Sequence, residues 1–185
     1  MADHVCPWWM AYTFDNALRR LCHDPNRMLG PYVKAGQKAV DIGCGLGHFT
    51  LGLARLVGPD GRVTAIDLQS KMLDGLKRRA KRAGLLDRIE TRQCRSDSLA
   101  AADLNGRMDF VLTFWMVHEV PDIPGLMRQI HDLLKPDGLY LIAEPGFHTK
   151  AEDFEQSVSA AESAGLKGIG RPQVRFSRTG LFTRS

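Results

Sequence analysis

Hydrophobic positions follow two different spacings along this chain. Short apolar runs bounded by turn residues predict buried strands; one ends at Ile42, and the others are "VTAIDL", "RIETRQC", "MDFVLTFW" and "LYLIAEP". Apolar residues three or four positions apart predict amphipathic helices instead. These helices are "HFTLGLARLV", a segment from a Ser70 cap to Gly84, a segment opened by Asp122 and Pro124 and ended by "KPDG", and residues 150–164.

The order of these elements predicts an α/β fold. Strands that alternate with helices of about ten to fifteen residues form parallel crossover units, because a tight hairpin cannot reach a parallel neighbour. The final stretch "VRFSRTGLFTRS" predicts two strands around a turn, paired antiparallel at one edge. No repeat, low-complexity tract or linker divides the chain, so one domain over residues 1–185 is expected.

Composition narrows the class of protein. The chain is 44% hydrophobic and 25% charged, and its apolar runs are far shorter than a bilayer span, so a soluble globular protein without a membrane segment is expected. The opening "MADHVCPWWMAYTF" lacks the pattern of a secretory signal, which indicates a cytoplasmic location. Four cysteines occur without a C-x-x-C pair, so we expect reduced thiols and no metal site.

Charge argues against a nucleic-acid partner. The formal net charge is only +4. The basic run "KRRAKR", residues 77–82, lies opposite the apolar stripe of its helix and therefore predicts a solvated helix face.

The stretch "VDIGCGLG" carries glycines at positions 43, 45 and 47, directly after a strand. Ligands of open α/β sheets bind beyond the carboxyl ends of the strands, where bare backbone lets a ligand come close and tolerates positive φ. The spacing matches neither G-x-G-x-x-G nor the P-loop pattern. Asp41 would repel a polyanion and attract an ammonium or sulfonium group, and Asp67, at the end of the next strand, suits ribose hydroxyls. The predicted ligand is a nucleoside with a positive centre.

Four segments carry a family resemblance. "VDIGCGLG", "AIDLQSKML", "DFVLTFWMVHEVPD" and "LLKPDGLYLIAEP" resemble successive motifs of the class I S-adenosylmethionine-dependent methyltransferases, in particular the small, single-domain, type 11/25-like members. The resemblance implies a doubly wound, seven-stranded, mostly parallel sheet with an antiparallel C-terminal edge strand. It also implies S-adenosylmethionine as cofactor and in-line methyl transfer. Because no sizeable insertion provides an acceptor domain, a small-molecule acceptor is expected.

The resemblance assigns residues to the cofactor. The glycine turn and Asp41 would hold the methionine portion, Asp67 the ribose, and residues near the end of the fourth strand would face the methyl group. The cofactor-binding residues implied in this way are Asp41, Gly43, Cys44, Gly45, Gly47, Asp67, Leu68, Met72, Arg95, Ser96, Asp97, Thr113 and Phe114.

The adenine contact departs from the usual family pattern. Members often carry an acid in a loop after the third strand, whereas this chain has "CRSDSL" there. Asp97 could accept a hydrogen bond from the adenine amino group, or the backbone of Arg95 and Ser96 could meet the adenine edge. Alternatively, Asp97 could cap a helix over residues 98–103.

His118 and Glu119, just after the fourth strand, are the candidate catalytic residues. Methyl transfer from a sulfonium depends mainly on alignment, and a base is needed only if the acceptor is protonated. His118 could take a proton near neutral pH. The alternative is that both side chains only hydrogen-bond the loop that leads to Pro121.

The N-terminal arm, residues 1–35, is rich in aromatic residues: Trp8, Trp9, Tyr12 and Phe14. The resemblance implies that such an arm could fold over the active site as a lid, with aromatic faces lining the acceptor pocket. It could instead pack on the sheet or on a second subunit, which would make a homodimer.

Two other functions share parts of this pattern. A binding protein could keep the S-adenosylmethionine site without turnover of its own. An NAD-dependent oxidoreductase has a similar layout, but the glycine spacing argues against it.

Overall fold

The computed structural model describes residues 22–184 of the chain. The chain divides into two compact units, Met1–Cys94 and Arg95–Ser185. The prediction of a single domain stays a prediction. Residues 1–21, which carry the aromatic residues of the N-terminal arm, lie outside the described residues, so the lid and homodimer predictions stay predictions too.

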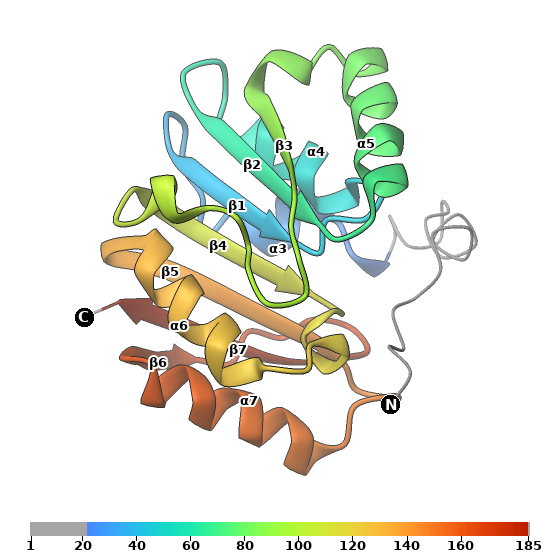
Figure 1. The fold of residues 1–185 in the computed structure, drawn as a ribbon. Coiled ribbons are helices and arrows are strands. Elements are labelled where there is room, and N and C mark those ends of the chain that lie inside the picture. The colour runs from blue at the N-terminus through green and yellow to red at the C-terminus, as the bar shows by residue number, and fades with distance from the viewer. Residues whose placement is uncertain (1–21, 185) are drawn as a thin grey trace. The chain divides into compact units, whose positions relative to one another are not determined.

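The first unit is built on parallel strands in the order β3-β2-β1. Helix α4 packs on β1 and β2, and α5 packs on β2 and β3. Its elements are α3 (Pro25–Leu29), β1 (Lys38–Ile42), α4 (His48–Leu56), β2 (Arg62–Asp67), α5 (Ser70–Arg82), the 3-10 turn η1 (Leu86–Arg88) and β3 (Ile89–Gln93), coloured blue to green in Figure 1.

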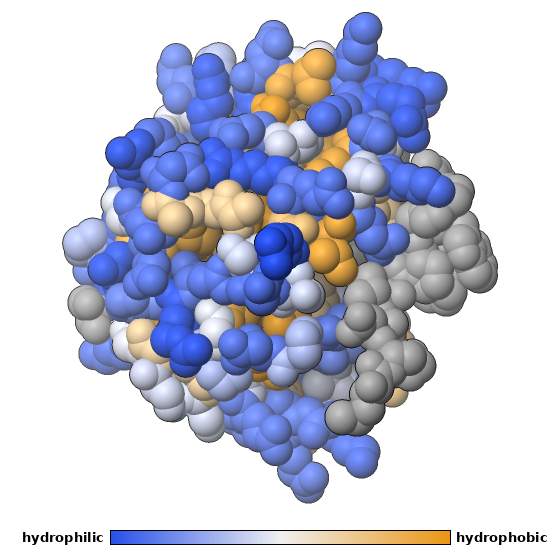
Figure 2. Space-filling view, viewed as in Figure 1, coloured by the Kyte–Doolittle hydropathy of each residue, from blue (hydrophilic) through white to orange (hydrophobic). Residues whose placement is uncertain are grey.

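The apolar runs of this unit become its core. Along β1 the side chains from Ala39 to Ile42 are all buried, and along β2 those from Val63 to Asp67 are buried. Helix α5 buries Met72 and Leu76 among its apolar positions, as its spacing predicts. Its basic residues Lys77, Arg78, Lys81 and Arg82 are exposed, and Figure 2 shows hydrophilic residues gathered over this region. The prediction of a solvated basic face is confirmed.

The predicted Ser70 cap is wrong. Ser70 is the first residue of α5, Gln69 occupies the N-cap, and no side chain of the N-cap residue bonds the first turn. The physical reason is that the Asp67 carboxylate already accepts a hydrogen bond from the Gln69 N–H, at 2.9 Å. The helix does end where predicted, with Gly84 in the left-handed region at φ 66°.

The second unit contains both parallel and antiparallel strands. β4 and β5 are parallel, whereas β7 runs antiparallel to both of its neighbours, β5 and β6. Helices α6 and α7 lie side by side over this sheet (Figure 1). The elements are η2 (Ala102–Leu104), β4 (Met108–Phe114), η3 (Val117–Glu119), α6 (Ile123–Leu133), β5 (Leu134–Pro145), α7 (Ala151–Ser163), β6 (Leu166–Gly170) and β7 (Ser177–Arg184).

Helix α6 starts and stops as its sequence predicts. The Asp122 side chain accepts a hydrogen bond from the Gly125 N–H at 2.9 Å, and Pro124 lies in the first turn. The helix ends at Leu133, and "KPDG" forms an irregularity at the start of β5. Met108 of β4 pairs with Leu134, but Phe110 pairs with Leu139.

The prediction for the C-terminal strands needs correction. "VRFSRTGLFTRS" contains one strand, β7, and not two. Its partner β6 lies earlier, in the segment "LKGIG". The antiparallel strand β7 is therefore flanked on both sides, and β6 forms the edge of this unit. Two glycines and mainly exposed side chains give β6 no apolar alternation, so its sequence does not look like a strand.

Seven strands occur in the described residues, three in the first unit and four in the second. Each predicted run from the first strand to "LYLIAEP" forms a strand, and each predicted helical segment from "HFTLGLARLV" to residues 150–164 forms a helix. In the part of the chain from residue 22 to 184, no helix has the length and hydrophobicity to span a bilayer.

Candidate active site

The turn between β1 and α4 is built from three glycines in the left-handed region. Gly43, Gly45 and Gly47 have φ values of 69°, 52° and 83°. The N–H groups of Gly43 and Cys44 both donate to the carbonyl of Ile66 on β2, at 2.8 and 3.1 Å. The turn is therefore fixed to the end of the neighbouring strand, at the place where the sequence predicts a ligand.

Gly45 and Gly47 lie in different surroundings, so a side chain would be excluded from each position for a different reason. A Cβ on Gly47 would run into the side chain of Leu76 on α5. A Cβ on Gly45 would meet no atom of the described residues within 4 Å. Close packing therefore requires glycine at position 47, whereas at position 45 the backbone faces open space that a ligand could approach.

Asp67 joins this turn to the end of β2. One carboxylate oxygen accepts from the Gly45 N–H at 2.8 Å and the other from the Gln69 N–H at 2.9 Å. Burial raises the pKa of Asp67, and the backbone donors only partly offset this effect. A carboxylate has about four acceptor positions, so both oxygens retain capacity for further donors such as hydroxyl groups. The acid thus lies directly at the glycine turn, and its contact with ribose stays a prediction.

Asp41 is buried, and its partner was not foreseen from the sequence. Thr50 in the first turn of α4 donates its hydroxyl hydrogen to the Asp41 carboxylate, with an oxygen–oxygen distance of 2.6 Å. Both side chains are almost completely inaccessible. The carboxylate thus lies beneath the turn, from where its charge acts through a medium of low polarity. Its attraction for a cationic ligand stays a prediction.

The cysteines near the turn are poor nucleophiles. Burial, with the neighbouring charges of Asp41 and Asp67, raises the pKa of Cys44 well above its usual value. Burial and Asp67 raise the pKa of Cys94 to about 11. Both thiols stay protonated near neutral pH, so neither is an activated nucleophile. Among residues 22–184, Cys22, Cys44 and Cys94 are all free thiols.

The remaining predicted residues of the first unit occupy α5 and the residues before it. Leu68 is about one third exposed, and its carbonyl accepts from the Gln93 side chain at 3.0 Å. Met72 is buried in the apolar face of α5. Leu68 is therefore accessible beside Asp67, as an adenine neighbour would have to be.

Residues 95–97 form an exposed turn at the start of the second unit. Arg95 and Ser98 form an isolated antiparallel bridge, and the Arg95 guanidinium lies 3.3 Å from the Asp97 carboxylate. Asp97 does not cap a helix over residues 98–103, because the only helical turn there is the 3-10 turn η2, whose N-cap is Ala101. The cap prediction is wrong, and the adenine contact of Arg95, Ser96 or Asp97 stays a prediction.

The end of β4 places Thr113 and Phe114 inside the second unit. Thr113 has no exposed surface, and its hydroxyl shares a 2.8 Å hydrogen bond with the Tyr140 hydroxyl. Phe114 stacks on Trp115, with ring centroids 5.2 Å apart. The Thr113 hydroxyl thus has a partner in the core, so the structure gives no support for its predicted contact with the methyl group.

Glu144 organises the loop after β4. This side chain is 1% exposed at the end of β5. One oxygen accepts from the N–H groups of Met116 and Val117, each at 3.0 Å; the other accepts from the His118 N–H at 3.1 Å and contacts the His118 ring Nδ1 at 2.5 Å. Sequence reasoning missed Glu144. The available signal was a carboxylate within an apolar run, which requires partners when it is buried.

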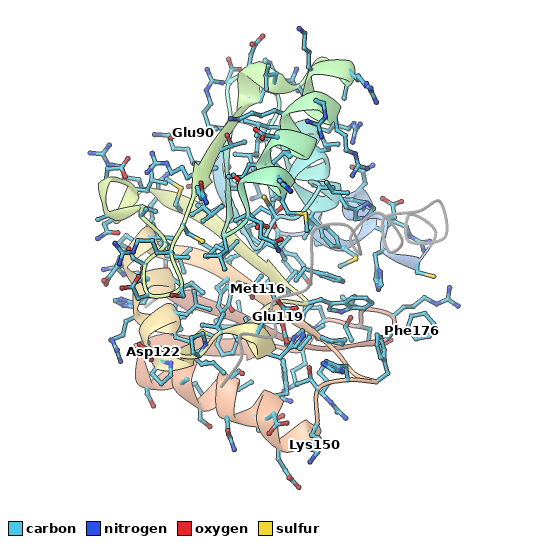
Figure 3. All side chains as sticks on the ribbon, turned by 45° about the vertical axis from the view of Figure 1, so that its right-hand side comes forward. Glu90, Met116, Glu119, Asp122, Lys150 and Phe176 are labelled. Atoms are coloured by element: carbon cyan, nitrogen blue, oxygen red, sulfur yellow. The ribbon has the colours of Figure 1, made fainter. Side chains whose placement is uncertain are left out.

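His118 lies among three titratable neighbours. Besides Glu144, the Glu119 carboxylate lies 3.9 Å from its Nε2, and the His148 ring packs edge-on at 5.2 Å between centroids. Burial lowers the pKa of His118, but the hydrogen bond and charge of Glu144 and the charge of Glu119 together raise it above its usual value. Figure 3 shows Met116 and Glu119 close together in this loop, with Asp122 further along the chain at the start of α6. The catalytic role of His118 and Glu119 stays a prediction.

Over residues 22–184, no group of three or more histidine, cysteine, aspartate or glutamate side chains could hold a metal ion.

Comparison with known proteins gives both a family and a fold. The family described as "Methyltransferase domain" matches residues 39–138, more than half of the chain. The demethylmenaquinone methyltransferase of Lactobacillus johnsonii is 35% identical over 112 residues, which are 60% of this chain and 45% of that protein. The match therefore spans less than half the length of this curated relative.

Solved structures resemble the chain over most of its length. A SAM dependent methyltransferase from Aquifex aeolicus has a TM-score of 0.86 at 19% identity, covering 98% of this chain and 100% of that one. Geranyl diphosphate C-methyltransferase from Streptomyces coelicolor, in complex with S-adenosyl-L-homocysteine, has a TM-score of 0.74 at 15% identity, covering 91% and 82%. These likenesses confirm the predicted doubly wound α/β fold.

Proposed function

Because the chain belongs to the methyltransferase domain family, we propose that it binds S-adenosylmethionine and transfers the methyl group to a small-molecule acceptor. The observation that carries the proposal is the pairing of the open Gly45 backbone with the Asp67 carboxylate, 2.8 Å from its N–H. A bare turn beside a strand-terminal acid suits a nucleoside whose ribose hydroxyls donate to the acid.

Different residues would bind different parts of S-adenosylmethionine. Gly43, Gly45 and the backbone of Cys44 would meet the methionine portion, and Asp67 would accept from the ribose hydroxyls. The buried Asp41, held by Thr50, would add negative potential beneath a ligand that carries positive charge. Leu68 and the segment Arg95–Asp97 are proposed neighbours of the adenine.

The small-molecule character of the acceptor is part of the proposal. Within residues 108–184, which the structure describes, no sizeable insertion lies between the strands, and a relative is named for demethylmenaquinone, a small molecule. Reduced demethylmenaquinone is therefore the first acceptor to test, with His118 and Glu119 as the candidate groups for proton transfer.

Two measurements test the proposal. Calorimetry with S-adenosylhomocysteine and NAD side by side should give binding of the first and none of the second; preferential NAD binding would overturn the cofactor assignment. Transfer of a labelled methyl group to reduced demethylmenaquinone, and to a panel of small metabolites, tests turnover. Tight cofactor binding without transfer to any acceptor would favour the second candidate, a binding protein without catalysis.

The single-domain organisation can be tested separately. We propose that both units, Met1–Cys94 and Arg95–Ser185, belong to one methyltransferase domain. One cooperative urea transition, the same by fluorescence and circular dichroism, is expected. Two separate transitions would contradict it.

A further inference from the structure

Both carboxylate oxygens of Glu144 form hydrogen bonds to one loop, residues 116–118, after β4. Its four contacts go to the N–H groups of Met116, Val117 and His118 and to the His118 ring. Three backbone N–H donors hold the carboxylate in one orientation and prevent it from swinging away. Its position at the end of a buried strand removes it from solvent, so the contact with His118 is made by a fixed group.

This contact determines which ring nitrogen of His118 is available. An ionised carboxylate can only accept hydrogen bonds, so the proton of the neutral imidazole lies on Nδ1, the nitrogen that faces Glu144 at 2.5 Å. The other nitrogen, Nε2, then carries a lone pair. The His118 side chain is 20% exposed, so a small molecule can reach it.

We propose that Glu144 is a positioning residue that makes Nε2 of His118 the proton acceptor for a methyl acceptor bearing a hydroxyl group. The inference rests on the proposed methyltransferase function and names the class of its acceptor. A neutral amine attacks with its own lone pair and needs no prior loss of a proton. A hydroxyl group, including that of an enol or a phenol, becomes a strong nucleophile only as its proton leaves.

The proposed step balances in atoms and charge. The hydroxyl proton passes to Nε2 of His118, and the electron pair released in the acceptor forms the new bond to the methyl carbon. The carbon–sulfur bond breaks, and its electron pair neutralises the sulfonium. Glu144 then faces an imidazolium, which its negative charge stabilises, and the proton leaves to solvent afterwards.

The charged groups around His118 support this role. Glu144 approaches from β5, Glu119 from the 3-10 turn η3, and His148 from the loop after β5. The two carboxylates raise the pKa of His118 against the opposing effect of burial. A raised pKa makes the neutral imidazole a stronger base toward a weakly acidic hydroxyl.

The tautomer of His118 can be measured without any substrate. The full chain would be labelled with ¹⁵N-histidine, and long-range ¹H–¹⁵N spectra recorded from about pH 5 to 9; His118→Gln assigns the signals. In the wild type the neutral ring should be protonated at Nδ1. In Glu144→Gln this preference should be lost and the pKa of His118 should fall. Glu155→Gln is the matched control, because it removes a surface carboxylate that bonds Arg171 in the same unit.

Kinetics with reduced demethylmenaquinone as probe gives the second readout. Glu144→Gln should lower kcat about 10-fold or more with little change in KM, and should move the acidic limb of the kcat–pH profile to lower pH. His118→Gln should lower kcat about 100-fold. Circular dichroism of each variant checks that the loop change leaves the fold intact.

The outcomes separate this inference from the proposed function. Protonation of neutral His118 at Nε2, or an unchanged tautomer and pKa in Glu144→Gln, would overturn the role of Glu144. Failure to bind S-adenosylhomocysteine would overturn the proposed function instead. If the cofactor binds and the tautomer is as expected, but the methylated acceptors all turn out to be amines, then the hydroxyl class is wrong.

Discussion

Gly45→Ala and Gly47→Ala should separate ligand binding from stability. Both glycines lie in the left-handed region, at φ 52° and 83°. They differ in their surroundings, because a Cβ at position 47 would run into Leu76 while one at position 45 would meet no described atom within 4 Å. The alanine methyl group at position 45 should therefore obstruct a ligand, and the one at position 47 should disturb the packing of α5.

The expected magnitudes follow from this geometry. An alanine in the left-handed region costs roughly 1–2 kcal/mol, and about half of this is recovered because the unfolded chain loses freedom, so Gly45→Ala should lower the free energy of unfolding by about 1 kcal/mol. Gly47→Ala adds an overpacking cost of roughly 1–3 kcal/mol. With about 2–4 °C per kcal/mol for a chain of this size, Gly47→Ala should lower Tm by roughly two to four times as much as Gly45→Ala.

Thermal unfolding and calorimetry with S-adenosylhomocysteine measure the two effects. Gly45→Ala should weaken binding about 10-fold or more, which corresponds to about 1.4 kcal/mol, since its methyl group projects where the ligand must lie. Gly47→Ala should lose less affinity despite its lower Tm. Wild-type affinity in Gly45→Ala would refute the identification of this open backbone as the docking surface.

Three further predictions concern the acids and their partners. Asp67→Asn should weaken S-adenosylhomocysteine binding by about 10-fold or more in calorimetry, because charged acceptors bond hydroxyls more strongly than amides; unchanged affinity would exclude the ribose contact. Thr50→Val should lower the free energy of urea unfolding by about 1–3 kcal/mol, because Asp41 loses a buried donor, and a neutral result would show that its other contacts suffice. The raised pKa of His118 means that its pairing with Glu144 stabilises the fold below the unfolded pKa of about 6.5 and that this stabilisation is lost as pH rises through the folded pKa. The stability difference between wild type and His118→Gln should therefore be larger in urea unfolding at pH 5.5 than at pH 8.5; equal differences would contradict the raised pKa.

Elements with strong periodicity could be predicted from the sequence, and those that depend on distant partners could not. The run "MDFVLTFW" and the apolar stripe of α5 follow from hydrophobic spacing alone. The edge strand β6 could not be predicted from the sequence, because its pairing with β7, and not its composition, makes it a strand. Ser70 was assigned the cap from residue type, whereas the Gln69 N–H is bonded by the strand-terminal Asp67.

The candidate site shows the same division. The glycine turn and Asp67 could be predicted, because their positions at strand ends follow from the order of the elements. Glu144 could not be linked to His118, since 26 residues separate them and only the adjacent carboxyl ends of β4 and β5 bring them together. Thr50 was missed for a similar reason, because its hydroxyl turns inward onto Asp41 and nothing in the helical pattern reveals that direction.

The irregular edge strand β6 has a consequence for solubility. Exposed strand edges offer unpaired backbone groups on which a second chain can add, and aggregation often starts there. In β6 the register shifts between Gly168 and Gly170, so the exposed Ile169 interrupts the regular ladder, and Lys167 adds a charge. Its short length, its glycines, the bulge and the lysine all disfavour intermolecular strand addition, so the β6 edge is a poor site for self-association.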